Sequence, residues 1–180
     1  MNELQSWDGN VANQRVFEWL LEKSQPSVRY FTLVELLGKR QDDPEVKEAY
    51  SGISRRGWAH DILLLQKPDG SWESDRRSPY GFGKLYRPKY TATNWMALVL
   101  SDLGLTKSNK QVKKAADLFF KEWLAIPSGE NIFHDEVCIV GNTARMLTRF
   151  GYGDEPKVKK LFDRLVEDQK EGRRLALLRL

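Results

Sequence analysis

The sequence lacks the features that mark disulfide-bonded, membrane-spanning or secreted proteins. It contains one cysteine, Cys138, so no disulfide can form within the chain, as is typical of a reducing compartment. No apolar run approaches the ~20 residues that a membrane-spanning helix requires. Residues 1–15 have neither the apolar core nor the cleavage site of a secretory signal. We therefore expect a cytoplasmic protein without a membrane span.

Neither sign of charge dominates the sequence. Few segments alternate apolar and polar residues in the way that β-strands do. The chain has 29 Lys and Arg residues against 25 Asp and Glu residues, a net charge of +4, and the two signs are interleaved. This pattern is typical of a solvated surface and argues against a nucleic-acid partner. What the chain does have is 41% hydrophobic residues and six tryptophans within 180 residues, enough for a packed core.

The apolar residues gather in segments that end at Gly38, Gly104 and Gly151. Glycine ends helices because it adopts the left-handed conformation without a clash at Cβ. A polar linker follows each glycine and leads to a Val-Lys pair that opens a second, more charged segment. The pattern predicts a repeat of paired helices, with a partial unit before the first copy. The Val-Lys pairs begin at Val46, Val112 and Val158.

The linkers carry the residue types that begin helices. An acidic residue stands directly before Pro44 and before Pro156, and Ser108 or Asn109 takes this place in the middle copy. Side-chain oxygens at the cap position accept hydrogen bonds from free N–H groups, and proline suits the first turn because it has no N–H. We expect each second helix to start at the end of its linker.

The two helices of a pair differ in charge. Residues 91–104 carry almost no charge and residues 138–151 carry only two arginines, whereas residues 112–124 are rich in Lys, Glu and Asp. A nearly uncharged helix is buried, and an amphipathic helix faces water on one side. Because one pair cannot bury its apolar face alone, neighbouring pairs must stack. We predict an all-α repeat fold with glycine-ended helices inside and charged helices outside.

Residues 57–72, GWAHDILLLQKPDGSW, place Gln66 after an apolar helical run and Trp72 after a turn with Asp69 and Gly70. This layout resembles the QW motif of the terpenoid cyclase and protein prenyltransferase superfamily, which includes the squalene cyclases. The resemblance implies an α/α-toroid of inner and outer helices, of which this chain supplies about half. It identifies an architecture rather than a reaction.

We predict an incomplete toroid-like domain over residues 1–171 and a basic tail over residues 172–180. By analogy with Asp69 and Trp72, the repeat calls for Asp-Gly-Gly-Trp after Glu171, where the chain has Gly-Arg-Arg-Leu. A one-nucleotide frameshift converts the first sequence into the second, and an ordinary basic amphipathic tail is the alternative. Since a half-toroid leaves an edge open, the chain should pair with itself or a partner, or belong to a longer protein.

The catalytic residues of the superfamily have no full counterpart here. The Asp-rich run that protonates an alkene in squalene-type cyclases is absent, and Asp42-Asp43 precedes a proline as a helix cap. The zinc site of protein prenyltransferases has a loose counterpart in Glu136 and Cys138, but no histidine follows His134. We assign no catalytic residue and no cofactor, expect Cys138 to be a small buried residue, and keep Zn²⁺ as the alternative. Whether the protein is an enzyme stays open.

Aromatic and polar residues of the predicted inner helices form the candidate binding site, unless they only pack between helix layers. Aromatic faces with a few polar groups suit a long apolar ligand such as an isoprenoid. We expect isoprenoid binding or processing in a longer or assembled form, and the alternative is a non-enzymatic scaffold that binds a protein. A closed pocket favours the lipid, and an open apolar face favours the protein. The candidates are Tyr90, Asn94, Trp95, Cys138, Asn142 and Arg145.

Overall fold

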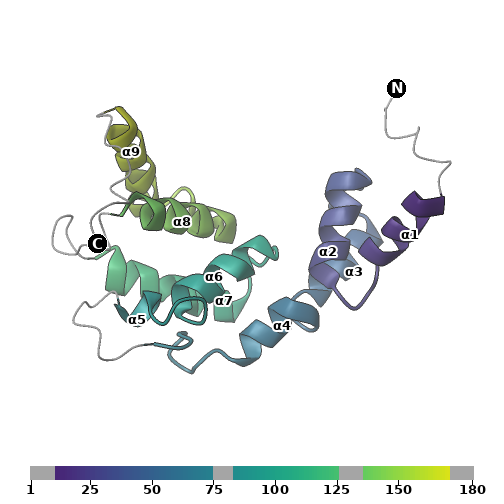
Figure 1. Ribbon diagram of the computed structural model, residues 1–180, viewed down its shortest axis with the longest axis horizontal. Coiled ribbons are helices and arrows are strands. Elements are labelled where there is room, and N and C mark those ends of the chain that lie inside the picture. Colours follow the sequence, from purple (N-terminus) through teal and green to yellow (C-terminus); the bar gives the residue numbers. More distant parts are fainter. Residues whose placement is uncertain (1–10, 75–82, 126–135, 171–180) are drawn as a thin grey trace. The chain divides into compact units, whose positions relative to one another are not determined.

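The computed structural model describes residues 11–74, 83–125 and 136–170, and within these ranges the chain is helical (Figure 1). An isolated bridge between Glu73 and Ala92 is the only strand-like pairing that these residues form. The predicted all-α fold class is confirmed, while the toroid stays a prediction. No helix in the described part of the chain has both the length and the apolarity needed to cross a membrane.

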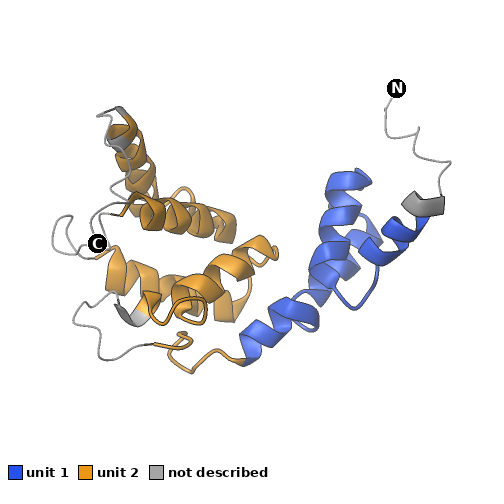
Figure 2. Cartoon of the chain, viewed as in Figure 1, with its two compact units in different colours: residues 1–64 blue, residues 65–180 orange. Residues whose placement is uncertain are grey.

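The chain divides into two compact units, residues 1–64 and residues 65–180 (Figure 2). In unit 1, short helices are joined by tight linkers. The described elements of unit 1 are α1 (Val11–Leu20), α2 (Pro26–Phe31), the wider π-type turn η2 (Thr32–Leu36), α3 (Pro44–Gly52) and α4 (Gly57–Leu64). Helix α2 and the turn η2 pack against α3, and Leu33 of η2 forms a buried core with Val46 and Ala49 of α3.

Unit 2 contains the second and third helix pairs of the predicted repeat. Its described elements are α5 (Gly83–Tyr86), α6 (Thr93–Asp102), α7 (Lys110–Leu118), η3 (Phe119–Trp123), α8 (Val137–Leu147), η5 (Thr148–Tyr152) and α9 (Pro156–Lys170). Two of the wider turns, η3 and η5, continue α7 and α8 without a break. The tail predicted over residues 172–180 lies outside the described residues.

The predicted glycine stops are confirmed. Gly38, Gly104 and Gly151 have φ angles of +62°, +88° and +94°, all in the left-handed region. A side chain with a Cβ atom is disfavoured there by about 1–2 kcal/mol, so glycine is the residue that ends a helix in this way at little cost. Each of the three copies therefore turns at the place that the sequence indicates.

Two of the predicted caps are confirmed, at the starts of α3 and α7. The Asp43 carboxylate accepts a hydrogen bond from the backbone N–H of Glu45 at 2.8 Å at the start of α3. In the middle copy the cap is Asn109, whose side-chain oxygen accepts from Gln111 N at 2.9 Å and from Val112 N at 3.1 Å. Both caps satisfy N–H groups that have no partner within their own helix.

Unit 2 has the division into inner and outer helices that the charge pattern predicts. Helices α6 and α8 pack against each other, α7 packs against α6, and α9 packs against α8. The inner helices bury large side chains such as Leu100 and Leu147, whereas α7 leaves Lys113 and Lys114 exposed. One stripe of each inner helix remains open, however, and Val99 lies exposed on the stripe of α6.

The turn that carries the QW-like residues ties α6 to α7. The Gln66 amide nitrogen donates to the carbonyl oxygen of Gly70 and to that of Gln111 on α7, both at 2.9 Å. The backbone N–H of Trp72 donates to the Thr93 hydroxyl at the start of α6 at 3.1 Å. The Trp72 ring is almost fully buried. One short turn thus fixes the starts of two helices.

The glycine in this turn has no room for a side chain. Gly70 has φ +91°, and a Cβ atom there would lie 2.9 Å from the Lys114 carbonyl oxygen. We expect Gly70→Ala to lower the free energy of unfolding by about 2 kcal/mol or more, because it adds backbone strain to a close contact. Gly141→Ala on α8 is the matched control: nothing lies within 4 Å, so alanine should raise stability by about 0.5–1 kcal/mol. Denaturant unfolding followed by circular dichroism measures both changes, and equal effects would contradict the close contact at Gly70.

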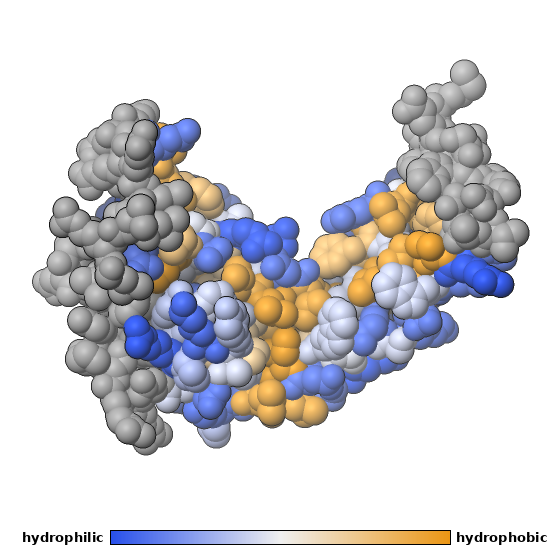
Figure 3. All heavy atoms as spheres, in the orientation of Figure 1, coloured by the Kyte–Doolittle hydropathy of each residue, from blue (hydrophilic) through white to orange (hydrophobic). Residues whose placement is uncertain are grey.

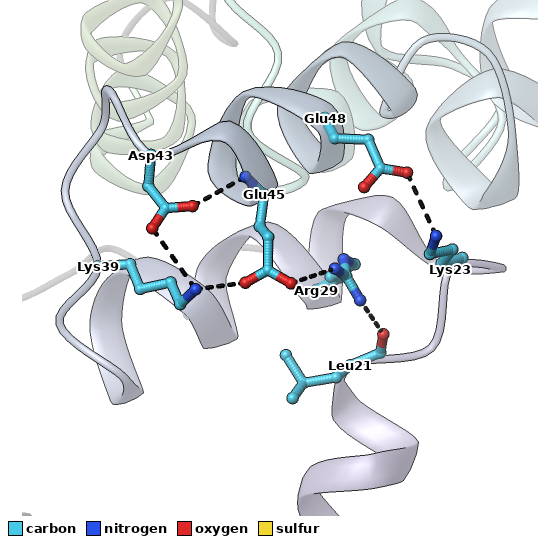
Figure 4. A network of polar contacts seen from close by, with 7 residues as sticks. All are labelled: Leu21, Lys23, Arg29, Lys39, Asp43, Glu45 and Glu48. Atoms are coloured by element: carbon cyan, nitrogen blue, oxygen red, sulfur yellow. Dashed lines mark hydrogen bonds and ion pairs between the residues drawn. The ribbon is translucent and has the colours of Figure 1, made fainter.

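A network of charged side chains joins the elements of unit 1 (Figure 4). The mostly buried Arg29 side chain donates from Nη1 to the Leu21 carbonyl oxygen at 2.7 Å and contacts the Glu45 carboxylate at 3.4 Å. Glu45 also pairs with Lys39, whose Nζ lies 3.5 Å from the Asp43 carboxylate. These contacts connect the residue after α1, helix α2 and the start of α3.

The network lowers the pKa of two carboxyl groups. The backbone hydrogen bond from Glu45 lowers the pKa of Asp43, and the hydrogen bond from Lys39 lowers the pKa of Glu45. Because the folded-state pKa lies below the unfolded value, each group favours the folded state above its ordinary pKa of 3.8 or 4.5. That contribution is lost as the pH falls through the lowered folded-state pKa.

We therefore expect the free energy of unfolding to decrease as the pH is lowered from about 5 to 3. Asp43→Asn should make this decrease smaller, because asparagine keeps the helix cap and removes the charge. Asp42→Asn, which removes a neighbouring carboxylate outside the cap, is the control. Denaturant titrations across this pH range provide the measurement, and an unchanged slope in Asp43→Asn would refute the role of that carboxylate.

Candidate functional site

The candidate binding residues all lie in unit 2, and all of them except Asn94 lie around one exposed side of α6 and α8. Tyr90 precedes α6, and Trp95 lies in its first turn. Cys138, Asn142 and Arg145 follow one another on α8 at a spacing of four and three residues, which places them on one stripe of the helix. We call this side of unit 2 the open face.

An aromatic cluster marks the beginning of the open face. The Trp95 ring contacts the rings of both Tyr86 and Tyr90, with centroid distances of 5.3 Å to each and tilted planes. The indole Nε1 also donates a hydrogen bond to the Tyr86 carbonyl oxygen at 3.2 Å. Tyr86 was missed in the sequence, although it stands four residues before Tyr90 in the same aromatic-rich loop.

The start of α8 lies beside the aromatic cluster. Burial raises the pKa of Tyr86, and the nearby Cys138 and Glu136 groups raise it further. At the other end, the Asp102 carboxylate of α6 meets Arg145 of α8. Helices α6 and α8 therefore run side by side in the same direction, and the open face extends along both.

An arginine pair marks the end of the open face. One oxygen of Asp102 accepts hydrogen bonds from Arg145 and from Arg149, the latter at 2.5 Å. The three side chains are between 40% and 46% exposed, so water reaches all of them. Two guanidinium groups share a single carboxylate, which leaves an excess of positive charge that an anionic group of a ligand could approach. Arg149 is a further residue that the sequence did not single out.

The open face is not closed from water. Tyr90 is 73% exposed and Val99 is 43% exposed. Val99 follows Trp95 by four residues and Asp102 follows by seven, so the three side chains lie on the same stripe of α6. Apolar, aromatic and charged groups are thus presented together on an accessible surface.

Asn94 lies elsewhere. It is buried on the packed side of α6 together with Ala97 and Ser101. Neighbouring residues of a helix point in directions about 100° apart, so Asn94 and Trp95 cannot both lie at the centre of one stripe. Asn94 therefore contributes to packing rather than to the open face.

The prediction that Cys138 is a small buried residue is wrong. Its side chain is exposed in the first turn of α8, because it lies on the stripe that continues through Asn142 and Arg145 rather than on the side packed against α6 and α9. Its Sγ lies 3.8 Å from the Glu136 carboxylate. Partial burial and then that carboxylate raise the pKa of the Cys138 thiol, which keeps it protonated near neutral pH.

The structure does not assemble a zinc site from the residues it describes. Among them, no group of three His, Cys, Asp or Glu side chains is arranged to hold a metal ion. His134 and Asp135, which belong to the zinc alternative, lie outside the described residues. Among the described residues, Cys138 and Glu136 provide only two potential ligands, whereas protein zinc sites use three or four.

Comparison with known protein families, with curated proteins and with solved structures finds no match for this chain. The resemblance to terpenoid cyclases and prenyltransferases therefore stays a prediction from the sequence pattern. That pattern consists of the glycine-ended helices, the capped linkers and the turn from Gln66 to Trp72.

Tyr90 has a strained backbone. Its φ angle of +72° lies in the left-handed region, which for a side chain with a Cβ atom costs about 1–2 kcal/mol. The strained residue is also the most exposed member of the aromatic cluster. Backbone strain of this kind is concentrated at functional positions, which makes the Tyr90 ring a candidate contact for a ligand.

The positive φ angle of Tyr90 predicts that glycine is more stable than alanine at this position, the reverse of their usual order in a helix. We expect Tyr90→Gly to be more stable than Tyr90→Ala by about 1 kcal/mol, because glycine adopts a positive φ without strain. At Val99 on helix α6 the order should be the usual one, with glycine less stable than alanine by about 1 kcal/mol. Denaturant unfolding of the four variants tests this, and the same order at both positions would contradict the strain at Tyr90.

Proposed function

We propose that unit 2 binds a long apolar molecule of the isoprenoid class along the open face, in a longer or assembled form in which further helical repeats cover that face. The main observation that supports this proposal is a row of side chains along α6 and α8. The aromatic cluster lies at one end, the arginine pair at the other, and Val99 between them. The likeness of the Gln66 turn to the QW motif supports the same class of ligand.

The chemistry of the row suits a chain-like molecule with a polar end. Indole and phenol faces bind apolar groups and stabilise positive charge. From Trp95 to Asp102 the row is about 10 Å long, at about 1.5 Å per residue. This length matches an extended hydrocarbon chain better than a compact ring. At the far end, Arg145 and Arg149 can exchange part of their contact with Asp102 for an anionic group such as a diphosphate.

Binding, and not a reaction, is what we propose. The raised pKa of Cys138 disfavours an activated thiol. Asp102, the carboxylate on the row, is 40% exposed and already bound to Arg145 and Arg149, so it is not enclosed with an apolar substrate.

A scaffold that binds a protein is the second candidate, and a specific observation favours it. Tyr90 and Val99 are open to solvent rather than enclosed in a pocket. An accessible apolar face rimmed by charged side chains is typical of protein-binding surfaces. This candidate requires no lipid, so a lipid-binding measurement distinguishes the two.

The test is calorimetric titration of the full chain with a prenyl alcohol and with the corresponding prenyl diphosphate. We expect both to bind, and Val99→Lys to weaken both at least tenfold, because it places a charge in the middle of the row. Val16→Lys is the matched control, since Val16 is also an exposed valine but belongs to unit 1. Absence of binding, or equal effects of the two variants, would remove the isoprenoid proposal.

The arginine pair has a separate test. Arg149→Gln should weaken the diphosphate about tenfold or more, the typical effect of losing a hydrogen bond to a charged group, and leave the alcohol unchanged. A variant that weakens both ligands equally would show that Arg149 acts on the fold rather than on the anionic group. Circular dichroism of each variant verifies that the helices are intact.

A further inference from the structure

The described surface exposes large apolar side chains among charged ones (Figure 3). Two of them, Phe162 and Val166, lie on α9, where they are 43% and 48% exposed. They are four residues apart and so share one stripe of the helix. Val158 and Leu161 on the same helix are buried, and α9 packs against α8. Helix α9 therefore has one covered apolar side and one uncovered apolar side.

The same positions are covered in the preceding repeat. Helices α7 and α9 share the pattern Val-Lys-Lys-x-x-Asp, over residues 112–117 and 158–163. In this register Ala116 corresponds to Phe162, and Phe120 corresponds to Val166. Ala116 is fully buried and Phe120 is partly buried. The second side of an outer helix is thus covered in one repeat and open in the next.

What covers that side in the preceding repeat is the glycine-ended turn of the following one. The Phe120 ring packs edge-on against Tyr152 of η5, with a centroid distance of 5.3 Å. The backbone N–H of Lys107 donates to the Phe150 carbonyl oxygen at 2.8 Å, and Lys107 Nζ donates to the Gly151 carbonyl oxygen at 2.6 Å. The Lys107 ammonium also lies 5.1 Å from the Tyr152 ring centroid. This is the repeat–repeat interface of unit 2.

The first repeat presents an uncovered turn of the same kind. Counted from the terminal glycine, Leu37 corresponds to Phe150, since each directly precedes its glycine. Phe150 is fully buried, whereas Leu37 is 42% exposed and its neighbour Leu36 is 46% exposed. The turn at Leu36–Gly38 thus has the features that cover an outer helix elsewhere in the chain.

The charged residues at the matching positions, just before α9 and just after the turn at Leu36–Gly38, are of opposite sign. By the same count, Asp154 corresponds to Lys107, and Lys39 corresponds to Tyr152. The contact between a lysine and an aromatic ring in the repeat–repeat interface would become a contact between the Asp154 carboxylate and the Lys39 ammonium. In the single chain, Asp154 pairs with Lys159, and Lys39 pairs with Asp43 and Glu45. Opposite charges at matching positions favour one partner and one register.

We propose that two copies of this chain associate head to tail, with the turn at Leu36–Gly38 of one copy covering Phe162 and Val166 of the other. The contact repeats the interface between Phe120 and the turn at Gly151. It is heterologous, since each copy contributes a different surface. The proposal depends on the repeat geometry and is independent of the proposed isoprenoid ligand.

The mass of the full chain in solution, measured by light scattering or sedimentation over a range of concentrations, tests the association. We expect the unaltered chain to form dimers or larger species. Val166→Glu and Leu37→Glu should each weaken association at least tenfold, because a buried carboxylate would replace an apolar contact. Lys160→Glu is the matched control on α9, since Lys160 is exposed on the opposite side of the helix, and it should associate normally.

Mixing the two variants distinguishes head-to-tail pairing from the alternatives. Val166→Glu keeps its turn at Leu37, and Leu37→Glu keeps its Val166, so an equimolar mixture should form dimers of one copy of each and nothing larger. A monomeric unaltered chain, or a mixture that stays monomeric, overturns the proposal. Association of Leu37→Glu alone would indicate tail-to-tail pairing and would also overturn it. So would association that appears only after residues 171–180 are removed, because that segment would then be the occupant.

Discussion

The turn between Gln66 and Trp72 is the constraint on which the arrangement of unit 2 depends. The Gln66 side-chain amide donates hydrogen bonds to the carbonyl oxygens of Gly70 and of Gln111 in α7. The backbone N–H of Trp72 donates to the Thr93 hydroxyl of α6. Two of these contacts are made to residues in the first turn of a helix, Gln111 in α7 and Thr93 in α6. Because the turn sets the beginning of α6, it also sets where the aromatic cluster stands, and α6 in turn is the surface against which α8 packs.

The open face combines features that point toward binding. Aromatic rings at one end, an exposed valine along the middle and two guanidinium groups on one carboxylate at the other end offer attachment for a molecule with an apolar and an anionic part. The exposure of Leu37 in the first repeat and of Phe162 and Val166 in the third has a common reason, since a helical repeat buries its sides only against a neighbouring repeat.

The sequence was informative wherever a local rule acts on one residue type. Glycines predicted the helix ends because few other residues adopt a positive φ cheaply, and the linkers predicted helix starts because Asp43 and Asn109 can bind free N–H groups. The choice between Ser108 and Asn109 was not decided by residue type, since either side chain can cap. The structure brings five of the six candidate residues to one face, and their role in binding stays a prediction. Tyr90, Trp95, Cys138, Asn142 and Arg145 lie around one face, whereas Asn94 is packed inside, and Tyr86 and Arg149 were missed because contacts between helices bring them there.

The sequence by itself determined the all-α class, the helix ends and the charge difference between the two helices of each pair, since these depend on interactions within a few residues. The tertiary structure alone decided which side of each helix is covered. Helices α7 and α9 begin with the same six-residue pattern, yet Ala116 is buried and Phe162 is exposed. Local sequence can specify that a helix has an apolar side, but the exposure of that side depends on whether another part of a folded chain lies against it.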